Sequence, residues 1–143
     1  MTKDRTKEYC EAEFENIDAT VAELVLITEP GKAAYSTADL AAMATFIHNI
    51  YNGIENILKR VLTLKKKQTK EGAAWHKDLL KTSVKADIIS PDLCSILAKY
   101  LSFRHFFIHG YGFTLKWEAL QPLVANIDKT LRDFKTAVYR HLV

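Results

Sequence analysis

The sequence has few residues of the kinds that cross-link or interrupt a chain. Among its 143 residues are two cysteines, three prolines and five glycines. Cys10 and Cys94 fall at apolar positions of helix-like segments, so we interpret them as reduced thiols in the core and not as a disulfide or ligand pair. Their spacing is not that of a zinc site, and we expect no metal site and no cofactor.

Long hydrophobic runs are also missing. No apolar run approaches the roughly 20 residues that a helix needs to span a bilayer. The N-terminal segment MTKDRTKEYCEAEFE is charged and lacks the apolar region of a secretory signal. Low-complexity tracts are absent, and the hydrophobic fraction of 48% is ordinary for a protein with a core. We therefore expect one cytoplasmic domain over residues 1–143, without a membrane partner.

Charge is distributed unevenly along the chain. The formal net charge is +3, but residues 1–29 carry three basic and eight acidic side chains. The remainder is strongly basic, and half of the residues from Lys59 to Lys70 are lysine or arginine. Such a block attracts polyanions, and it is also a common way to solvate a helix end, where cations interact favourably with the C-terminal dipole. On charge alone, both interpretations stay open.

The hydrophobic pattern is helical throughout, with no convincing alternation of period two. Apolar residues at three- and four-residue steps predict a first helix over residues 3–28, which ends at the breaker sequence EPGK. A second, long helix opens at Ser36, which can cap it, and runs to about residue 67. Its almost strict three–four alternation predicts one face buried along the whole length, and Gly53 beside that face allows another helix to approach closely.

Three further helices complete the predicted fold. A short helix is expected around Trp75, and a fourth helix begins at the Ser90 cap and ends near His109. The last helix lies within residues 117–142 and has Pro122 in its first turn, so we expect it to begin near residue 120. The prediction is an all-α fold, an antiparallel bundle of four long helices with one short additional helix.

The phase of the fourth helix singles out Arg104. The predicted apolar stripe of this helix comprises Leu93, Leu97, Tyr100, Leu101, Phe107 and Ile108. The step from Leu97 through Leu101 continues to Arg104 and places its guanidinium at the buried face. An unpaired charge there is very costly, so Arg104 needs a carboxylate, a phosphate, or a solvated cleft or subunit seam.

Two histidines follow on the same helix. His105 and His109 are four residues apart and share a face, whereas His109 lies about 140° around an ideal helix from Arg104. Arg104 and His109 converge on one target only if the helix frays, if the arginine reaches round, or if two copies meet across a two-fold axis. Histidine exchanges protons near neutral pH and arginine binds phosphate, so these residues fit phosphoryl transfer on RNA. No acidic cluster accompanies them to hold Mg²⁺, so such chemistry would be metal-independent.

The octapeptide RHFFIHGY, residues 104–111, resembles the R-x4-H-x-Y signature of the HepT branch of the HEPN superfamily, the higher eukaryotes and prokaryotes nucleotide-binding domains. The context agrees, because the motif ends a proline-capped helix, precedes a glycine turn and leads into a final amphipathic helix. YNGIENILKR, residues 51–60, is similar to the second helix of this family, and WHKDLL, residues 75–80, to the short segment that follows. The resemblance thus extends over nearly the whole chain.

The resemblance implies a homodimer with the motifs of both subunits near a shared cleft, and a metal-independent ribonuclease activity. It further implies a toxin of a toxin–antitoxin pair, with tRNA as the target. The implied partner is an MntA-like nucleotidyltransferase, which uses ATP to neutralise the toxin by AMPylation. Carried over by position, Arg104 would bind the scissile phosphate and stabilise its transition state, His109 would be a general acid or base, and Tyr111 would accept AMP.

Four other polar residues have less specific interpretations. His105 is either an auxiliary group for RNA or phosphate or a surface histidine. His76 is expected to be structural or exposed. Asn52 and Glu55 lie on the polar side of the second helix. A role for them in a cleft is the less favoured interpretation.

The resemblance also favours contact between the RNA backbone and the run Lys65, Lys66 and Lys67, because phosphate contacts supply most sequence-independent affinity. The alternative to a nuclease is a non-catalytic helical module that binds a nucleotide or a nucleotidyltransferase. A metal enzyme based on His105 and His109 is a poor interpretation, since two imidazoles without an acidic or cysteine companion make a weak site.

Overall fold

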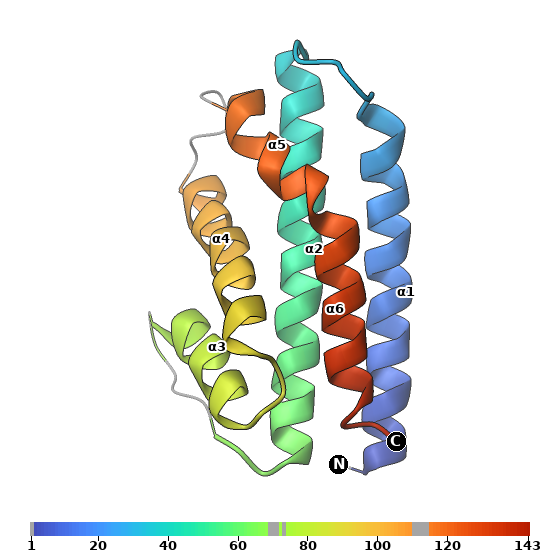
Figure 1. Ribbon diagram of the computed structural model, residues 1–143, viewed down its shortest axis with the longest axis vertical. Helices are drawn as coiled ribbons and strands as arrows, with labels where there is room; N and C mark the ends of the chain where they lie inside the picture. Colours follow the sequence, from blue (N-terminus) through green and yellow to red (C-terminus); the bar gives the residue numbers. More distant parts are fainter. Residues whose placement is uncertain (1, 69–71, 73, 110–114) are drawn as a thin grey trace.

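The structure, a computed structural model, describes residues 2–68, 72, 74–109 and 115–143. Within them the chain is all-helical and has no strand (Figure 1). The all-α class is confirmed, and none of these helices combines the length and apolar character needed to cross a membrane. The six helices are α1 (Lys3–Ile27), α2 (Thr37–Leu64), α3 (Trp75–Lys85), α4 (Pro91–Ile108), α5 (Trp117–Ala125) and α6 (Ile127–Tyr139).

The long helix α2 is the centre of the fold. Ser36 caps it as predicted, because its hydroxyl accepts the Asp39 N–H at 3.0 Å. The predicted apolar stripe is buried along its length. Helix α1 packs against α2 so closely that a methyl group on Gly53 would lie 2.8 Å from Ile17 Cγ1. The expected close approach at Gly53 is therefore confirmed.

The end of α2 lies three residues earlier than predicted. The helix ends at Leu64, and Lys66 has a φ of 58°, which is the left-handed conformation that terminates a helix. The Lys67 N–H then donates to the Leu62 carbonyl at 2.9 Å, which satisfies one of the carbonyls that the helix end exposes. The three lysines thus form the turn after α2 and not its last turn.

The prediction of four long helices is wrong at the last one, because the structure divides it at Asn126 into α5 and α6. The expected start near residue 120 is also wrong, because α5 begins at Trp117 and holds Pro122 in its interior. Proline removes the N–H that would bond to the carbonyl of Glu118. That residue is exposed, so solvent can satisfy its carbonyl, and the helix tolerates the proline before it breaks four residues later.

The two ends of the chain close the core together. The Phe14 ring on α1 meets Phe134 on α6 edge-on, with centroids 5.9 Å apart. Lys135 of α6 pairs with Asp18 of α1 at 2.8 Å. On the other side of α2, α3 and α4 form a separate flank of the molecule (Figure 1). This flank carries the residues that the sequence marks as functional.

Candidate active site between α3 and α4

Arg104 lies at the edge of the buried face of α4, where it is half-buried. Its Nε donates to the side-chain oxygen of Asn52 on α2 at 3.0 Å. The partner required by the phase of α4 is thus an uncharged amide, which orients the guanidinium without neutralising it. The predicted stripe is wrong at its end, because Phe103 is buried while Ile108 is half exposed.

Asn52 also contacts a histidine that sequence reasoning did not single out. Its amide nitrogen lies 3.1 Å from Nε2 of His48. Since the amide oxygen accepts from Arg104, the amide nitrogen donates to His48, whose Nε2 is then the unprotonated acceptor of a neutral ring. Burial, together with the nearby Arg104 charge, lowers the pKa of His48 and favours this neutral form.

Glu55 was expected on the polar side of α2, but it is only 3% exposed. His76, at the start of α3, covers it: Nδ1 lies 2.8 and 3.0 Å from the two carboxylate oxygens. The His76 ring also packs against the Trp75 ring in a tilted arrangement, with centroids 3.6 Å apart, and Lys59 Nζ lies 3.8 Å from the centre of the Trp75 ring. His76 thus has a structural contact to α2, as expected, and it is not an exposed residue.

These contacts form one line along α2, which we call the polar ridge. Its four residues have the spacing of one helical face, beside the buried stripe. The first two contact α4 and the last two contact α3, so the ridge fixes the positions of both helices relative to α2. The polar ridge comprises His48, Asn52, Glu55 and Lys59.

A cavity of about 640 Å³ opens between α3 and α4. Its floor is apolar, its charged lining side chains are all basic, and two histidines lie on its walls. Such a lining suits an anionic ligand with an apolar part, for example a nucleotide unit. The lining consists of Ala74, His76, Lys77, Leu80, Lys81, Cys94, Ala98, Leu101, Ser102, Arg104 and His105.

The predicted catalytic residues are only partly brought together. Arg104 and His105 both line the α3–α4 cavity, whereas His109 does not. His109 is the exposed C-cap of α4, and its ring lies 4.2 Å from the His105 ring, which confirms that the two histidines share a face. Tyr111, the predicted AMP acceptor, lies outside the described residues.

The lysine run is not part of this cavity. Lys65 follows Asn52 by thirteen residues, which places it about 20 Å further along the axis of α2. The basic residues that line the cavity beside Arg104 are Lys77 and Lys81 of α3. Sequence reasoning missed both, because isolated lysines on a short amphipathic helix carry no signal of their own.

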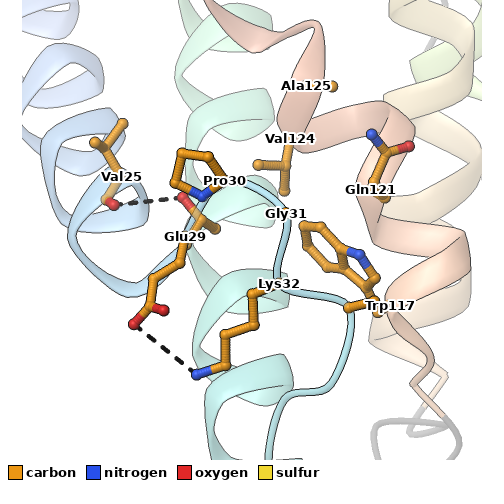
Figure 2. Close-up of a pocket in the computed structure, with 11 residues that line it drawn as sticks. Val25, Glu29, Pro30, Gly31, Lys32, Trp117, Gln121, Val124 and Ala125 are labelled. Atoms are coloured by element: carbon orange, nitrogen blue, oxygen red, sulfur yellow. Dashed lines mark hydrogen bonds and ion pairs between the residues drawn. The ribbon is translucent and has the colours of Figure 1, made fainter.

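A second hollow, of about 480 Å³, lies where the α1–α2 connection meets α5. Figure 2 shows its walls: Pro30 and Gly31 face the indole of Trp117, and an ion pair joins Glu29 to Lys32. Neither a histidine nor an arginine lines this hollow. The α3–α4 cavity is the candidate active site because the motif residues Arg104 and His105 line it.

Two other kinds of chemistry find little support in the cavity lining. Burial raises the pKa of the Cys94 thiol, so it stays protonated and is a poor nucleophile. In the part of the chain that the structure describes, no three histidine, cysteine or acidic side chains gather as metal ligands. What the lining offers is cationic side chains and imidazoles.

The described residues thus form an all-α protein with a cavity whose charged lining residues are all basic. A family model described as HepT-like protein matches residues 42–142, which is more than half of the chain. The chain belongs to this family, as the motif at residues 104–111 predicts. No match was found among curated proteins or among solved structures. The matched region begins within α2 and includes the polar ridge, the cavity and the motif.

Proposed function

We propose that this protein is a metal-independent endoribonuclease that cleaves RNA at the α3–α4 cavity. The observation that carries the proposal is Arg104, a family-motif arginine on the wall of a cavity whose charged lining residues are all basic. RNA is a polyanion, and its affinity for proteins comes largely from cations that neutralise phosphates. The proposed substrate is tRNA in the cytoplasm, and the proposed role is that of a toxin.

In this proposal Arg104 binds the scissile phosphate and stabilises the charge that develops on it during attack. His109 transfers a proton, and His105 assists on the cavity wall. His109 diverges from Arg104 within one chain, so the proposal includes a homodimer that brings the partner subunit's His109 to the cavity. Phe106 and Ile108, which are 36% and 50% exposed at the same end of α4, support an apolar subunit contact there.

Inhibition follows from the position of Tyr111, two residues beyond His109. We propose that an MntA-like nucleotidyltransferase transfers AMP from ATP to the tyrosine oxygen and releases pyrophosphate. The added AMP is anionic and bulky, so it competes with RNA phosphate for the cations of the cavity. Lys65, Lys66 and Lys67 bind the backbone of an RNA long enough to reach from the cavity to the turn after α2.

The test of catalysis is incubation of the purified protein with tRNA in EDTA. We expect cleavage by the wild type and none by the double variant Arg104→Ala, His109→Ala. Lys99→Ala is a matched control, because Lys99 is an exposed cation on α4 outside the cavity lining. Full-rate cleavage by the double variant would refute the assignment of the site.

The test of inhibition uses the co-encoded nucleotidyltransferase and ATP. Mass spectrometry should find one AMP on Tyr111 and loss of RNA cleavage in proportion to the modified fraction. Tyr111→Phe should keep nuclease activity and escape inhibition. If the protein expressed alone does not inhibit bacterial growth and instead binds the nucleotidyltransferase tightly, the non-catalytic alternative is favoured.

A further inference from the structure

The contact between Glu55 and His76 joins a buried carboxylate to a cavity-lining imidazole. Both carboxylate oxygens lie within 3.0 Å of His76 Nδ1, and the Glu55 side chain is almost completely buried. A buried carboxylate without a hydrogen-bond donor is very costly. The contact therefore fixes the protonated nitrogen of His76 at Nδ1 and leaves Nε2, on the other side of the ring, to exchange a proton.

His76 is well fixed in this orientation. Its ring packs against the tilted ring of Trp75, which in turn contacts Lys59 of α2. Only 17% of the His76 side chain is exposed, and it lines the cavity that also contains Arg104 and His105. One chain thus places a phosphate-binding guanidinium and two imidazoles around a single cavity. A purely structural contact between α2 and α3 would not require the histidine to lie on the cavity wall.

We propose that His76 is a catalytic residue, the general base of the RNA cleavage step, and that Glu55 is its positioning residue. The inference rests on the proposed ribonuclease function and adds a proton acceptor to it. The carboxylate holds the imidazole in one tautomer and stabilises the positive charge that the ring gains, as a buried carboxylate does for a catalytic histidine in other hydrolases.

The reaction is a transesterification within the RNA. Nε2 of His76 takes the proton of the ribose 2′-hydroxyl, and the 2′ oxygen forms a bond to phosphorus. The bond from phosphorus to the 5′ oxygen breaks, and this oxygen takes a proton from the partner subunit's His109, which the proposed homodimer brings to the cavity. The products are a 2′,3′-cyclic phosphate and a 5′-hydroxyl, and solvent returns both imidazoles to their starting states.

The charged neighbours of His76 come from three helices. Glu55 and Lys59 lie on α2, Lys77 and Lys81 on α3, and Arg104 with His105 on α4. Apart from Glu55 these groups are cationic or can become so. Among these groups Glu55 is thus the anionic one, and its carboxylate lies 2.8 Å from Nδ1 of His76.

The first experiment measures tRNA cleavage in EDTA by the wild type, His76→Gln and Glu55→Gln. We expect kcat to fall about 100-fold or more for His76→Gln, which is the usual contribution of a general base. We expect a smaller but clear fall for Glu55→Gln, because glutamine still offers an oxygen to Nδ1 but no negative charge. His141→Gln is the matched control: this histidine also contacts another segment, through the Asp87 carbonyl, but lies outside the cavity lining.

The second experiment separates catalysis from structure. Binding of 2′-O-methylated tRNA, which cannot react, should be unchanged in His76→Gln and weakened in Arg104→Ala. Once the cleavage position is mapped, a substrate with sulfur in place of the 5′ oxygen should restore cleavage by His109→Gln but not by His76→Gln. A thiolate leaves without a proton, whereas the attacking hydroxyl still needs a base.

The outcomes distinguish the inference from the function on which it rests. If the wild type cleaves no RNA, both are overturned. If the wild type cleaves RNA and His76→Gln keeps its kcat, the proposed function stands and the role of His76 is refuted. Rescue of His76→Gln by the sulfur substrate would also refute it. If His76→Gln does not fold, the test rests on Glu55→Gln, which keeps the side-chain length and an acceptor oxygen. An unchanged kcat in Glu55→Gln would then refute the inference.

Discussion

The hydrogen bond from Arg104 to Asn52 allows a test of how the guanidinium is held. Arg104 can turn about its long side chain, and the amide of Asn52, 3.0 Å from Nε, fixes one edge of the guanidinium group. Asn52→Ala removes this contact and leaves the charge of Arg104 in place. The variant therefore separates the orientation of the guanidinium from its presence.

The expected magnitude follows from the geometry. A hydrogen bond from a charged donor contributes about 1.5–3 kcal/mol. Arg104 is only half-buried, so solvent replaces part of the lost contact, and the lower end of that range applies. Because 1.36 kcal/mol corresponds to a factor of ten in rate, we expect kcat/KM for tRNA to fall about tenfold in Asn52→Ala. The loss should be well below that of Arg104→Ala.

Asn52→Asp makes the test sharper. An aspartate can still accept from Arg104, and its charge strengthens the contact. The same charge reduces the field that attracts a phosphate, so we expect activity to fall further than in Asn52→Ala. Asn49→Ala, an exposed asparagine on the same helix, is the control. Initial rates at low substrate concentration and thermal unfolding should be measured for each variant. If Asn52→Ala keeps the kcat/KM of the wild type, a positioning role for the amide is refuted.

Three further predictions concern stability. Gly53→Ala should destabilise the fold, since overpacking against Ile17 costs about 1–3 kcal/mol and the higher helix propensity of alanine returns at most about 1 kcal/mol. In an Ile17→Ala background, urea unfolding should show the same change to be neutral or stabilising. His48 has a lowered pKa in the folded state, so its contribution to the free energy of unfolding is complete above its ordinary pKa of 6.5 and is lost as pH falls through the lowered folded value. Urea unfolding between pH 7.5 and 5 should therefore show a smaller loss of stability in His48→Gln than in the wild type. Tyr100→Phe removes a buried 2.7 Å hydrogen bond to the Leu123 carbonyl and should cost about 1–3 kcal/mol, measured as a lower Tm; an unchanged Tm would contradict it.

The helical elements could be predicted because each is encoded locally. The caps at Ser36 and Ser90 and the unbroken stripe of α2 are patterns within one segment, and the structure confirms them. The division at Asn126 could not be predicted in this way. It depends on how α5 and α6 each pack against other helices, and the apolar spacing continues across it from Leu123 to Ile127.

The candidate site was predictable only where its signal also lay within one segment of the chain. The phase of α4 correctly indicated that Arg104 needs a partner. It could not identify Asn52, because that residue lies 52 positions earlier in the chain. Glu55 was placed on the polar side of α2 although it is buried, since a helical pattern does not reveal which polar residues another helix covers. The spacing of the polar ridge beside the apolar stripe was the available signal.

The packing of Phe14 against Phe134 has a consequence for how the protein matures. The ribosome makes α6 after α1, α2, α3 and α4, so the contact between α1 and α6 forms later than those helices. The cavity residues emerge earlier, on α2, α3 and α4, while the core beside them still lacks its final layer. The core beside the cavity is therefore complete only after α6 has been made, so a chain that has not yet reached α6 carries the proposed site on an unfinished core.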